Sequence, residues 1–371
     1  MMCKLSDICE FVKGKVAVSN LTKMNYISTE NMLPNRGGIV EAATLPSVDT
    51  TQTYTIGDIL VSNIRPYFKK IWFATTNGGC SNDVLVFRAK KDVNPFYLYY
   101  ILSDDRFFNY ATATSKGTKM PRGDKIAIMN YEIEKHTRSE QDAIASILRP
   151  IDEKIALNRE INNNLLEQAT TLFKSWFVDF LPFNCSKPHT WRTIQLGDVS
   201  IMGAGGDKPK TTSATRTAEC PYPIFSNGLT DYGLYGYTNE AKIFDESVTV
   251  SARGTIGFVC LRHEPYVPIV RLVTLIPKKD LVSAKYLYLF LLQTNILGTG
   301  TTQQQLTVPD FKKTEIVVPD NTTMAAFTDI VAPLFNQLWA NEEENNRLSQ
   351  LRDALLPKLL SGELDVSEVE I

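Results

Sequence analysis

The sequence lacks the features that mark secreted and membrane-spanning proteins. Its six cysteines show no paired CxxC spacing, and the amino-terminal MMCKLSDICEF has no apolar core of a signal peptide. The apolar run YLYLFLLQTNIL, which begins at Tyr286, is much shorter than the roughly 20 residues that cross a bilayer. We therefore expect a reduced, cytoplasmic protein without a membrane segment.

The chain also lacks a large excess of positive or negative charge and a complete set of metal ligands. The 39 Lys and Arg residues nearly balance the 41 Asp and Glu residues, and the formal net charge is -2. Any contact with nucleic acid must therefore come from local patches rather than a uniformly basic surface. Cys260 and His263 have ligand-like spacing, but no second pair completes a zinc site, so no metal is expected.

What the sequence does contain is one pattern that occurs twice. A shift of 183 residues carries several residues onto residues of the same type, from a glycine-rich loop through a long polar and apolar repeat. The pairs are Gly117 and Gly300, Pro150 and Pro333, Asn158 and Asn341, Asn163 and Asn346, and Leu165 and Leu348. Because 371 residues can bury more than one core, this repeat predicts two similar globular blocks, each followed by a long helix.

The stretch from Ser139 to about Phe180 has helical periodicity. Ser139 is expected to cap the helix, with acidic residues in the first turn, and apolar residues then recur every three or four positions. The same steps recur after the 183-residue shift, which predicts two helices of about 40 residues, each roughly 60 Å long. The predicted coiled-coil seam comprises Ile144, Ile151, Ile155, Asn158, Leu165, Leu172, Leu334, Leu338, Asn341, Leu348 and Leu355.

Two prolines and two asparagines interrupt these apolar patterns. We expect Pro150 and Pro333 to kink each helix or to start it afresh. Asn158 and Asn341 lie in the seam, where asparagine is known to fix the register of coiled coils. The alternative is a pair of unrelated surface helices, and the shared offset of these four residues argues against it.

The rest of the chain predicts an α+β fold with two similar globular domains. Strand-like runs at 57–62, 84–88, 245–251 and 270–276 alternate with turn residues, and an apolar helix is expected at about 95–109 in one block and 284–297 in the other. The predicted order is a domain at 1–138, a helix at 139–181, a domain at 182–321, and a helix with a tail at 322–371.

The segment Asn94-Pro-Phe-Tyr97 is similar to the motif with which amino-methyltransferases hold a target amine. The second proline of that motif is missing, and no GxGxxG-like nucleotide loop precedes the segment. Asn94 as a helix cap, with Pro95 at the first helical position, explains the same residues. We therefore expect a helix start here and no catalytic residue.

Three segments resemble type I restriction-modification specificity subunits. They are the helix IASILRPIDEKIALNREINNNLLEQATTLFKSWFVDF, the strand region GDILVSNIRPYFKKIW and the closing LSQLRDALLPKLLSGEL. The resemblance covers essentially the whole chain. It implies a non-catalytic subunit in which two antiparallel helices separate two target-recognition domains, and each domain reads one half of a bipartite site in double-stranded DNA.

The resemblance also implies partners and cofactors. Methyltransferase subunits, two in number, would bind along the helices and recognition domains, and restriction subunits would join that core. S-adenosylmethionine, ATP and magnesium would belong to those partners, with no cofactor in this chain.

The candidate DNA-contacting residues combine short polar side chains with lysine and arginine. Glutamine can bond adenine in the major groove, arginine is the commonest partner of guanine, and lysine suits phosphate. The candidates are Arg65, Lys69, Lys70, Lys116, Thr118, Lys119 and Arg122 in the first block, and Ser251, Arg253, Thr301, Thr302, Gln303, Gln304, Gln305 and Lys312 in the second.

Two other functions remain open from the residues alone. One is a coiled-coil scaffold or adaptor whose two domains bind proteins rather than DNA. The other is a self-sufficient methyltransferase. Binding to DNA that weakens steeply as salt rises would argue against the scaffold, and methyl transfer by the isolated chain would favour the methyltransferase.

Overall fold

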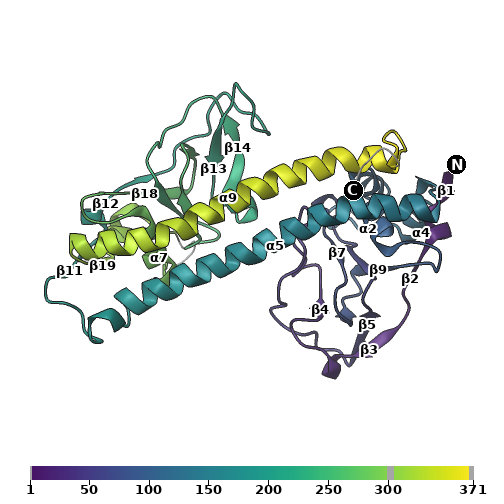
Figure 1. The fold of residues 1–371 in the computed structure, drawn as a ribbon, viewed down its shortest axis with the longest axis horizontal. Helices are drawn as coiled ribbons and strands as arrows, with labels where there is room; N and C mark the ends of the chain where they lie inside the picture. The colour runs from purple at the N-terminus through teal and green to yellow at the C-terminus, as the bar shows by residue number, and fades with distance from the viewer. Residues whose placement is uncertain (1, 299–304, 367–371) are drawn as a thin grey trace. The chain divides into compact units, whose positions relative to one another are not determined.

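The computed structural model describes residues 2–298 and 305–366, apart from the side chain of Thr230. The chain divides into two compact units. Unit 1 comprises Met1–Asn158 and Glu343–Ile371, and unit 2 comprises Arg159–Glu342. Each unit thus contains one β-rich lobe together with a segment of both long helices (Figure 1).

The two long helices are α5 (Arg138–Phe177) and α9 (Asn321–Leu360), and each has 40 residues. Within each unit their segments pack antiparallel (Figure 1). The expected cap at Ser139 is wrong by two residues. Thr137 precedes the helix, its backbone N–H donates to the Glu140 carboxylate at 2.6 Å, and its hydroxyl accepts from the Glu140 N–H at 3.4 Å.

Neither proline starts a new helix, so that part of the expectation is wrong. Pro150 and Pro333 lie inside continuous helices. A proline in a helix interior costs about 3 kcal/mol because a backbone hydrogen bond is lost. Leu148 and Val331, two residues before the prolines, are fully buried in the apolar cores of the lobes. We attribute the continuity of the helices to this packing.

The lobe of unit 1 contains two four-stranded sheets. The first has the order β2 (Cys9–Phe11), β9 (Val84–Ala89), β6 (Ile59–Ser62) and β7 (Ile71–Phe73), and the second has β3 (Lys15–Ala17), β5 (Thr50–Tyr54), β8 (Gly78–Cys80) and β4 (Tyr26–Ile27). A separate ladder joins β1 (Met2–Lys4) to β10 (Glu132–Glu134). The helices are α1 (Leu5–Ile8), α2 (Pro95–Ser103), α3 (Asp105–Ala113) and α4 (Lys125–Met129), with a 3₁₀ turn η1 (Val18–Asn20).

The helix expected at 95–109 is two helices. Asp104 ends α2 and caps α3, because its carboxylate accepts from the Arg106 N–H at 2.7 Å. Asn94 caps α2 as predicted, and its side-chain oxygen accepts from the Phe96 N–H at 2.8 Å. The break directs the apolar faces of both helices into one core, which also contains Ile144 and Leu356 from the long helices.

The lobe of unit 2 repeats this architecture. Its four-stranded sheet has the order β12 (Ser200–Ala204), β18 (Leu272–Pro277), β15 (Ser247–Ser251) and β16 (Val259–Arg262), and a three-stranded sheet has β14 (Leu234–Thr238), β13 (Tyr222–Phe225) and β17 (Val267–Pro268). A ladder joins β11 (Arg192–Gln195) to β19 (Glu315–Val318). The remaining helices are α6 (Leu196–Val199), α7 (Ala284–Gln293) and α8 (Val308–Phe311), with 3₁₀ turns η3 (Leu181–Phe183) and η4 (Thr230–Gly233).

The long helices use their most apolar residues for the lobe cores rather than for each other. Phe173, Phe327 and Phe335 are buried in the core of unit 2. Of the seam positions, Ile144, Ile155, Asn158 and Asn341 are buried, whereas Ile151, Leu165, Leu172, Leu334, Leu338, Leu348 and Leu355 are half-buried.

Amide and charged side chains join the central parts of the two helices. In unit 1, the Asn158 amide donates to Glu344 at 2.7 Å and to Asn345 at 3.0 Å. In unit 2, the Asn341 amide donates to Asn162 at 2.8 Å. These directional bonds favour one register of the helix pair over alternatives that would leave the amides unpaired. Among the described residues, no helix is long and apolar enough to cross a membrane.

Candidate nucleic-acid interface

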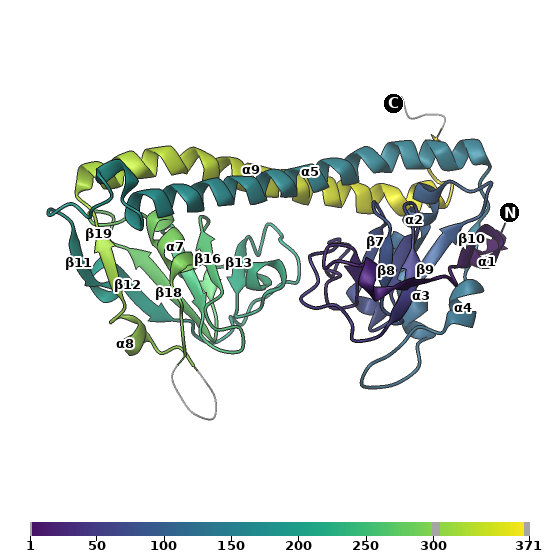
Figure 2. The ribbon, with the colours of Figure 1, turned by 90° about the horizontal axis from the view of Figure 1, so that it is seen from below.

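In unit 1, two candidate DNA-binding segments lie side by side. The first is the β6–β7 turn, residues 63–70, which includes the 3₁₀ turn η2 (Pro66–Phe68). The second is the loop at residues 114–124, between α3 and α4, which extends away from the long helices (Figure 2). The Gly123 N–H donates to the Asn63 carbonyl at 3.1 Å, and the Arg65 N–H donates to the Pro121 carbonyl at 2.8 Å. We call residues 63–70 the recognition turn of unit 1.

The 114–124 loop is closed at its base and open at its tip. Lys116 and Arg122 exchange two backbone hydrogen bonds of 2.8 and 2.9 Å. Their side chains form ion pairs within the lobe, Lys116 with Asp124 at 2.5 Å and Arg122 with Asp83 at 3.0 Å. Thr118 and Lys119 lie between them and are exposed. The fixed base therefore presents these two side chains to solvent.

The ion pair with Lys116 also changes the titration of Asp124. The pKa of the Asp124 carboxyl is lowered by the Lys116 ammonium and by hydrogen bonds from the backbone N–H groups of Ala127 and Ile126 at the start of α4. The carboxylate thus stays charged at neutral pH and keeps the end of the loop attached to α4.

The basic residues of the recognition turn are directed largely into their own chain. Lys69 pairs with Asp105 at 2.8 Å, and the Lys70 ammonium donates to the Thr29 carbonyl at 2.6 Å. Burial lowers the pKa of Lys70. The Nε atom of Arg65 is buried and has no hydrogen-bond partner among the residues that the structure describes. Of the predicted contacts in this unit, Thr118 and Lys119 are thus better placed for DNA than these three residues.

Unit 2 contains the same backbone arrangement. Its recognition turn, residues 252–258 between β15 and β16, corresponds in sequence and strand position to the turn of unit 1. The Leu306 N–H donates to the Ala252 carbonyl at 2.9 Å, as the Gly123 N–H donates to Asn63. We call residues 114–124 of unit 1 and the segment of unit 2 that ends at Leu306 the distal loops. Each unit therefore attaches the end of its distal loop to the carbonyl of the first residue of its recognition turn.

The predicted contacts of unit 2 occupy different environments. Arg253 lies in the recognition turn and is half-buried, and Gln305 directly precedes the Leu306 attachment and is exposed. Ser251 is only 1% exposed, so its hydroxyl faces the interior. Lys312 is exposed at the end of α8, with its stem against Gly197. Thr301, Thr302, Gln303 and Gln304 lie outside the described residues.

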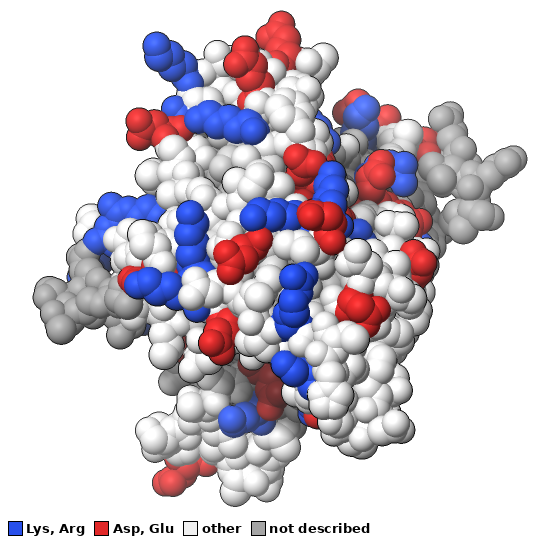
Figure 3. Space-filling view, turned by 90° about the vertical axis from the view of Figure 1, so that its left-hand side faces the viewer, with Lys and Arg blue, Asp and Glu red and all other residues white. Residues whose placement is uncertain are grey.

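Several residues that hold these segments in place were not predicted from the sequence. Asp83 and Asp124 fix the loop of unit 1, and the Asn227 amide donates to the Arg253 carbonyl at 2.8 Å in unit 2. Asp124 precedes an apolar stretch, which is a cap signal, but the other two have none. On the face of the molecule in Figure 3, Lys and Arg are interspersed with Asp and Glu, as the near-zero net charge predicts.

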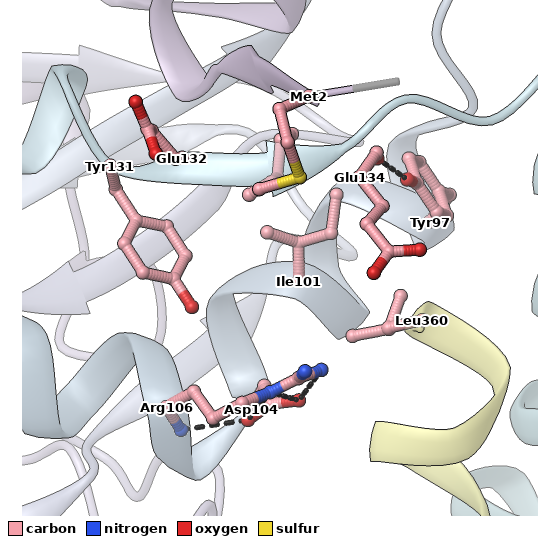
Figure 4. A pocket seen from close by; sticks show the side chains of 10 residues that line it. Met2, Tyr97, Ile101, Asp104, Arg106, Tyr131, Glu132, Glu134 and Leu360 are labelled. Atoms are coloured by element: carbon pink, nitrogen blue, oxygen red, sulfur yellow. Dashed lines mark hydrogen bonds and ion pairs between the residues drawn. The ribbon is translucent and has the colours of Figure 1, made fainter. Parts of the chain in front are cut away.

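A small pocket in unit 1 offers no catalytic centre (Figure 4). It lies between α2, the β1–β10 ladder and the end of α9, and Arg106 in its wall is paired with Asp104 at 2.8 Å. Tyr97 is bonded to the Glu134 carbonyl at 3.2 Å and to the His136 ring at 2.8 Å. Among the residues that the structure describes, no group of three or more His, Cys, Asp or Glu could hold a metal ion.

The methyltransferase-like segment has a structural role in the lobe of unit 1. The Asn94 oxygen accepts the bonds that cap α2, while its amide nitrogen donates to Asp142 at 2.6 Å. Burial raises the pKa of Tyr97. Both ends of the Asn94 side chain are therefore engaged within unit 1.

Comparisons with known proteins identify the family. The family model described as type I restriction modification DNA specificity domain matches residues 1–167 and 188–350. The MjaIX specificity subunit of Methanocaldococcus jannaschii is 28% identical over 328 residues, which cover 80% of this chain and 74% of the relative. The HindI specificity subunit of Haemophilus influenzae is 24% identical, with 97% of this chain and 98% of the relative covered.

A solved structure has the same fold. The crystal structure of the type I restriction-modification S subunit from M. genitalium superposes with a TM-score of 0.59 at 17% identity, and covers 97% of this chain and 96% of that chain. The chain therefore belongs to the family of type I restriction-modification specificity subunits. It is the DNA specificity component of such a system, and this component is non-catalytic.

Proposed function

We propose that each lobe reads one half of a bipartite site in double-stranded DNA, and that α5 and α9 set the spacer between the halves. One observation carries this proposal: the bond from the end of the distal loop to the recognition turn occurs in both units, from Gly123 to Asn63 and from Leu306 to Ala252. Two equivalent reading surfaces, each joined to part of the same two helices, suit a site with two separate halves.

The contacts follow from the accessibility of the candidates. In unit 1, Thr118 and Lys119 reach the DNA from the loop tip, and Lys116 and Arg122 stabilise the loop base while adding positive charge near phosphates. In unit 2, Arg253 and Gln305 contact bases together with residues 301–304, and Lys312 contacts a phosphate. Lys69, Lys70 and Ser251 support the turns from within the lobes, and Arg65 lies at the junction of turn and loop.

Catalysis belongs to partner subunits in this proposal. Two methyltransferase subunits bind the specificity chain and carry S-adenosylmethionine, and restriction subunits carry ATP and magnesium. Two reading surfaces in one chain raise the effective concentration of the second surface once the first has bound, so neither half-site needs high affinity alone.

The test is to exchange one lobe. Residues 182–321 are replaced by those of another member of the family, the chimera is produced with its methyltransferase subunits, and the modified adenines of the host genome are mapped. The proposal predicts that one half of the methylated motif changes and the other half is retained. Changes in both halves, with the chimera folded, would contradict separate reading by the two lobes.

Salt dependence distinguishes the proposed function from a protein-binding scaffold. If the chain reads DNA, specific binding of the assembled complex to DNA should weaken steeply with salt, because lysine and arginine displace counterions from phosphates. Lys119→Gln should reduce the steepness of log affinity against log salt by about one unit, the change expected for the loss of one phosphate contact. Lys23→Gln, on an exposed loop of the same lobe, is the control. No binding of the wild-type complex to DNA at low salt would favour the scaffold.

A further inference from the structure

Each unit contains two consecutive residues other than glycine in the left-handed backbone region. In unit 1 they are Asn35 and Arg36, with φ of 53° and 59°. Unit 2 has two such pairs: Asn184 and Cys185, both with φ of 57°, follow η3, and Asp231 and Tyr232, with φ of 48° and 54°, lie near the recognition turn. Such residues persist only where their surroundings hold them, and they concentrate at functional sites. We call Asn35–Arg36 and residues 226–233 the bracing segments of units 1 and 2.

The bracing segment of unit 1 is attached to the recognition turn through its backbone. The Asn35 N–H donates to the Phe68 carbonyl and the Arg36 N–H to the Lys69 carbonyl, both at 2.9 Å. Arg36 also pairs with Asp105, which is the partner of Lys69. Burial alone would raise the pKa of Asp105, but the hydrogen bonds and charges of Lys69 and Arg36 lower it. The turn is thus joined to Arg36 by both backbone and charge.

The other side of Arg36 faces the long helices. Its Nη1 atom lies 4.0 Å from the Asp353 carboxylate of α9. Asp353 pairs with Arg352 at 2.9 Å, and Arg352 pairs with Asp152 of α5 at 2.8 Å. The Arg36 side chain is only 9% exposed, whereas its partners Asp105 and Asp353 are 56% and 48% exposed, so solvent screens these ion pairs from the carboxylate side. A continuous set of ion pairs therefore connects the recognition turn to both long helices within unit 1.

The bracing segment of unit 2 makes the equivalent connection with different chemistry. At one end the Asn227 amide donates to the Arg253 carbonyl at 2.8 Å, and the Thr255 hydroxyl donates to the Asn227 carbonyl at 2.9 Å. At the other end Tyr232, which is 59% exposed, lies beside Glu342 of α9, and burial of its hydroxyl together with the charge of Glu342 raises the pKa of Tyr232. The Tyr232 carbonyl also accepts from Arg262 at 2.7 Å.

We propose that Arg36 and Tyr232 are positioning residues that fix the orientation of each recognition turn relative to α9. The inference rests on the proposed function, because orientation matters only if both lobes must meet DNA together. The lobe cores already attach the lobes to the helices. In unit 2 the last buried apolar core residue of α9 is Phe335, Trp339 packs against that core and stacks on His263, and Glu342 lies three residues further, about 4.5 Å along the helix. A contact at the end of this row restricts rotation of the lobe about the core.

The test measures how strictly the spacer is recognised. The complex of the chain with its methyltransferase subunits is assayed on oligonucleotides with the wild-type spacer and with one base pair added or removed. Arg36→Met removes the central ion-pairing side chain of unit 1, and Tyr232→Phe removes only a hydroxyl from unit 2. Arg138→Met breaks an exposed ion pair in unit 1, and Tyr235→Phe removes an exposed hydroxyl in unit 2.

We expect both positioning variants to reduce the ratio of methylation at the correct spacer to that at altered spacers by about 2- to 30-fold. The bases of the half-sites should stay the same, and the two control variants should match wild type. A variant with a lower Tm and an unchanged ratio would show that the residue only stabilises the fold, which would overturn the inference. If Arg36→Met does not fold, Tyr232→Phe alone decides between these results.

Failure of the proposed function gives a different result. If the wild-type complex methylates sites with all three spacers equally, or needs only one half-site, the proposal that the long helices set the spacer is wrong. The positioning role is then wrong as well. If wild type discriminates between spacers and both variants do so equally well, only the positioning role is wrong.

Discussion

The two units fill the junction between recognition turn and distal loop in opposite ways. In unit 1 the turn supplies the large residue, Asn63, and the loop supplies Gly123. In unit 2 the turn supplies the small residue, Ala252, and the loop supplies Leu306, which is buried in the same core. The hydrogen bond between turn and loop is common to both. The backbone frame is therefore preserved while side-chain volume is redistributed across it.

This difference explains how one fold can read unlike sequences. The hydrogen bond that joins turn and loop in both units is between main-chain atoms, which do not depend on the side chains beside them. Side chains at the tip, such as Thr118 and Lys119 in unit 1, are then able to differ between lobes without changing the frame.

Leu306→Ala should have the largest effect. Leu306 is 5% exposed, and truncation of a buried leucine costs about 2 to 5 kcal/mol through lost transfer energy and the cavity that remains. We expect a lower Tm and poorer discrimination in the half-site read by unit 2, with the half-site of unit 1 unchanged. Leu297→Ala, at a 70% exposed position in the same unit, is the matched control. An equal loss of discrimination in both half-sites would contradict independent junctions.

Gly123→Leu imposes the arrangement of unit 2 on unit 1. A Cβ atom at Gly123 would lie 2.8 Å from Ile128 and 2.9 Å from the Asn63 side-chain oxygen, so overpacking should cost about 1 to 3 kcal/mol. Asn63→Ala in the same chain should restore part of this loss, because it empties the space that leucine needs. The free energies of unfolding of both single variants and the double variant give the coupling. Strictly additive effects would mean that the two side chains do not share that space.

Glu342→Gln tests the bracing segment of unit 2, where a carboxyl with a raised pKa takes the place of the ion pairs of unit 1. Burial raises the pKa of Glu342 from 4.5 to about 7, although the Tyr232 hydrogen bond and the Arg262 charge lower it. The folded protein then holds more protons than the unfolded chain between pH 4.5 and 7. The contribution of Glu342 to stability is present below about pH 4.5 and is lost as pH rises through 7, by at most about 3 kcal/mol, which the partial exposure of the residue reduces.

The measurement is the difference in Tm between wild type and Glu342→Gln from pH 5 to pH 8. The Tm of wild type should fall between pH 5 and pH 8, and the Tm of the variant should fall by less. Glu343→Gln, at the next position on α9 and in an exposed ion pair with Arg347, should leave the decline intact. Identical pH profiles for wild type and Glu342→Gln would show that the carboxyl is ionised in the folded state throughout.

Periodicity in the sequence was sufficient for the main elements of the fold. The three- and four-residue steps predicted both 40-residue helices, and the apolar runs predicted β6, β9, β15 and β18 to within about two residues, because local pattern and burial agree there. The helix at 95–109 was overextended because Asp104 was not recognised as a cap. The continuity at Pro150 was also missed, because it depends on packing of the helix into a lobe core formed by distant residues.

Much less of the candidate site could be predicted. The sequence identified the loop around Gly117 and the turn around Arg65, and the structure places them together through Pro121. It did not show that Lys69 and Lys70 are engaged by Asp105 and Thr29. Such pairings join residues that are far apart in the sequence, and a single chain carries no local signal of them.

In the proposed function, α5 and α9 set the distance between the two reading surfaces. Insertion of seven residues, about two helical turns, after Asn158 and after Glu342 lengthens both helices by about 10 Å. Mapping of modified adenines in cells that produce this variant with its methyltransferase subunits measures the consequence directly. The account predicts unchanged half-sites with a spacer longer by about three base pairs, at about 3.4 Å per pair. Methylation at the original spacer by the folded variant would contradict it.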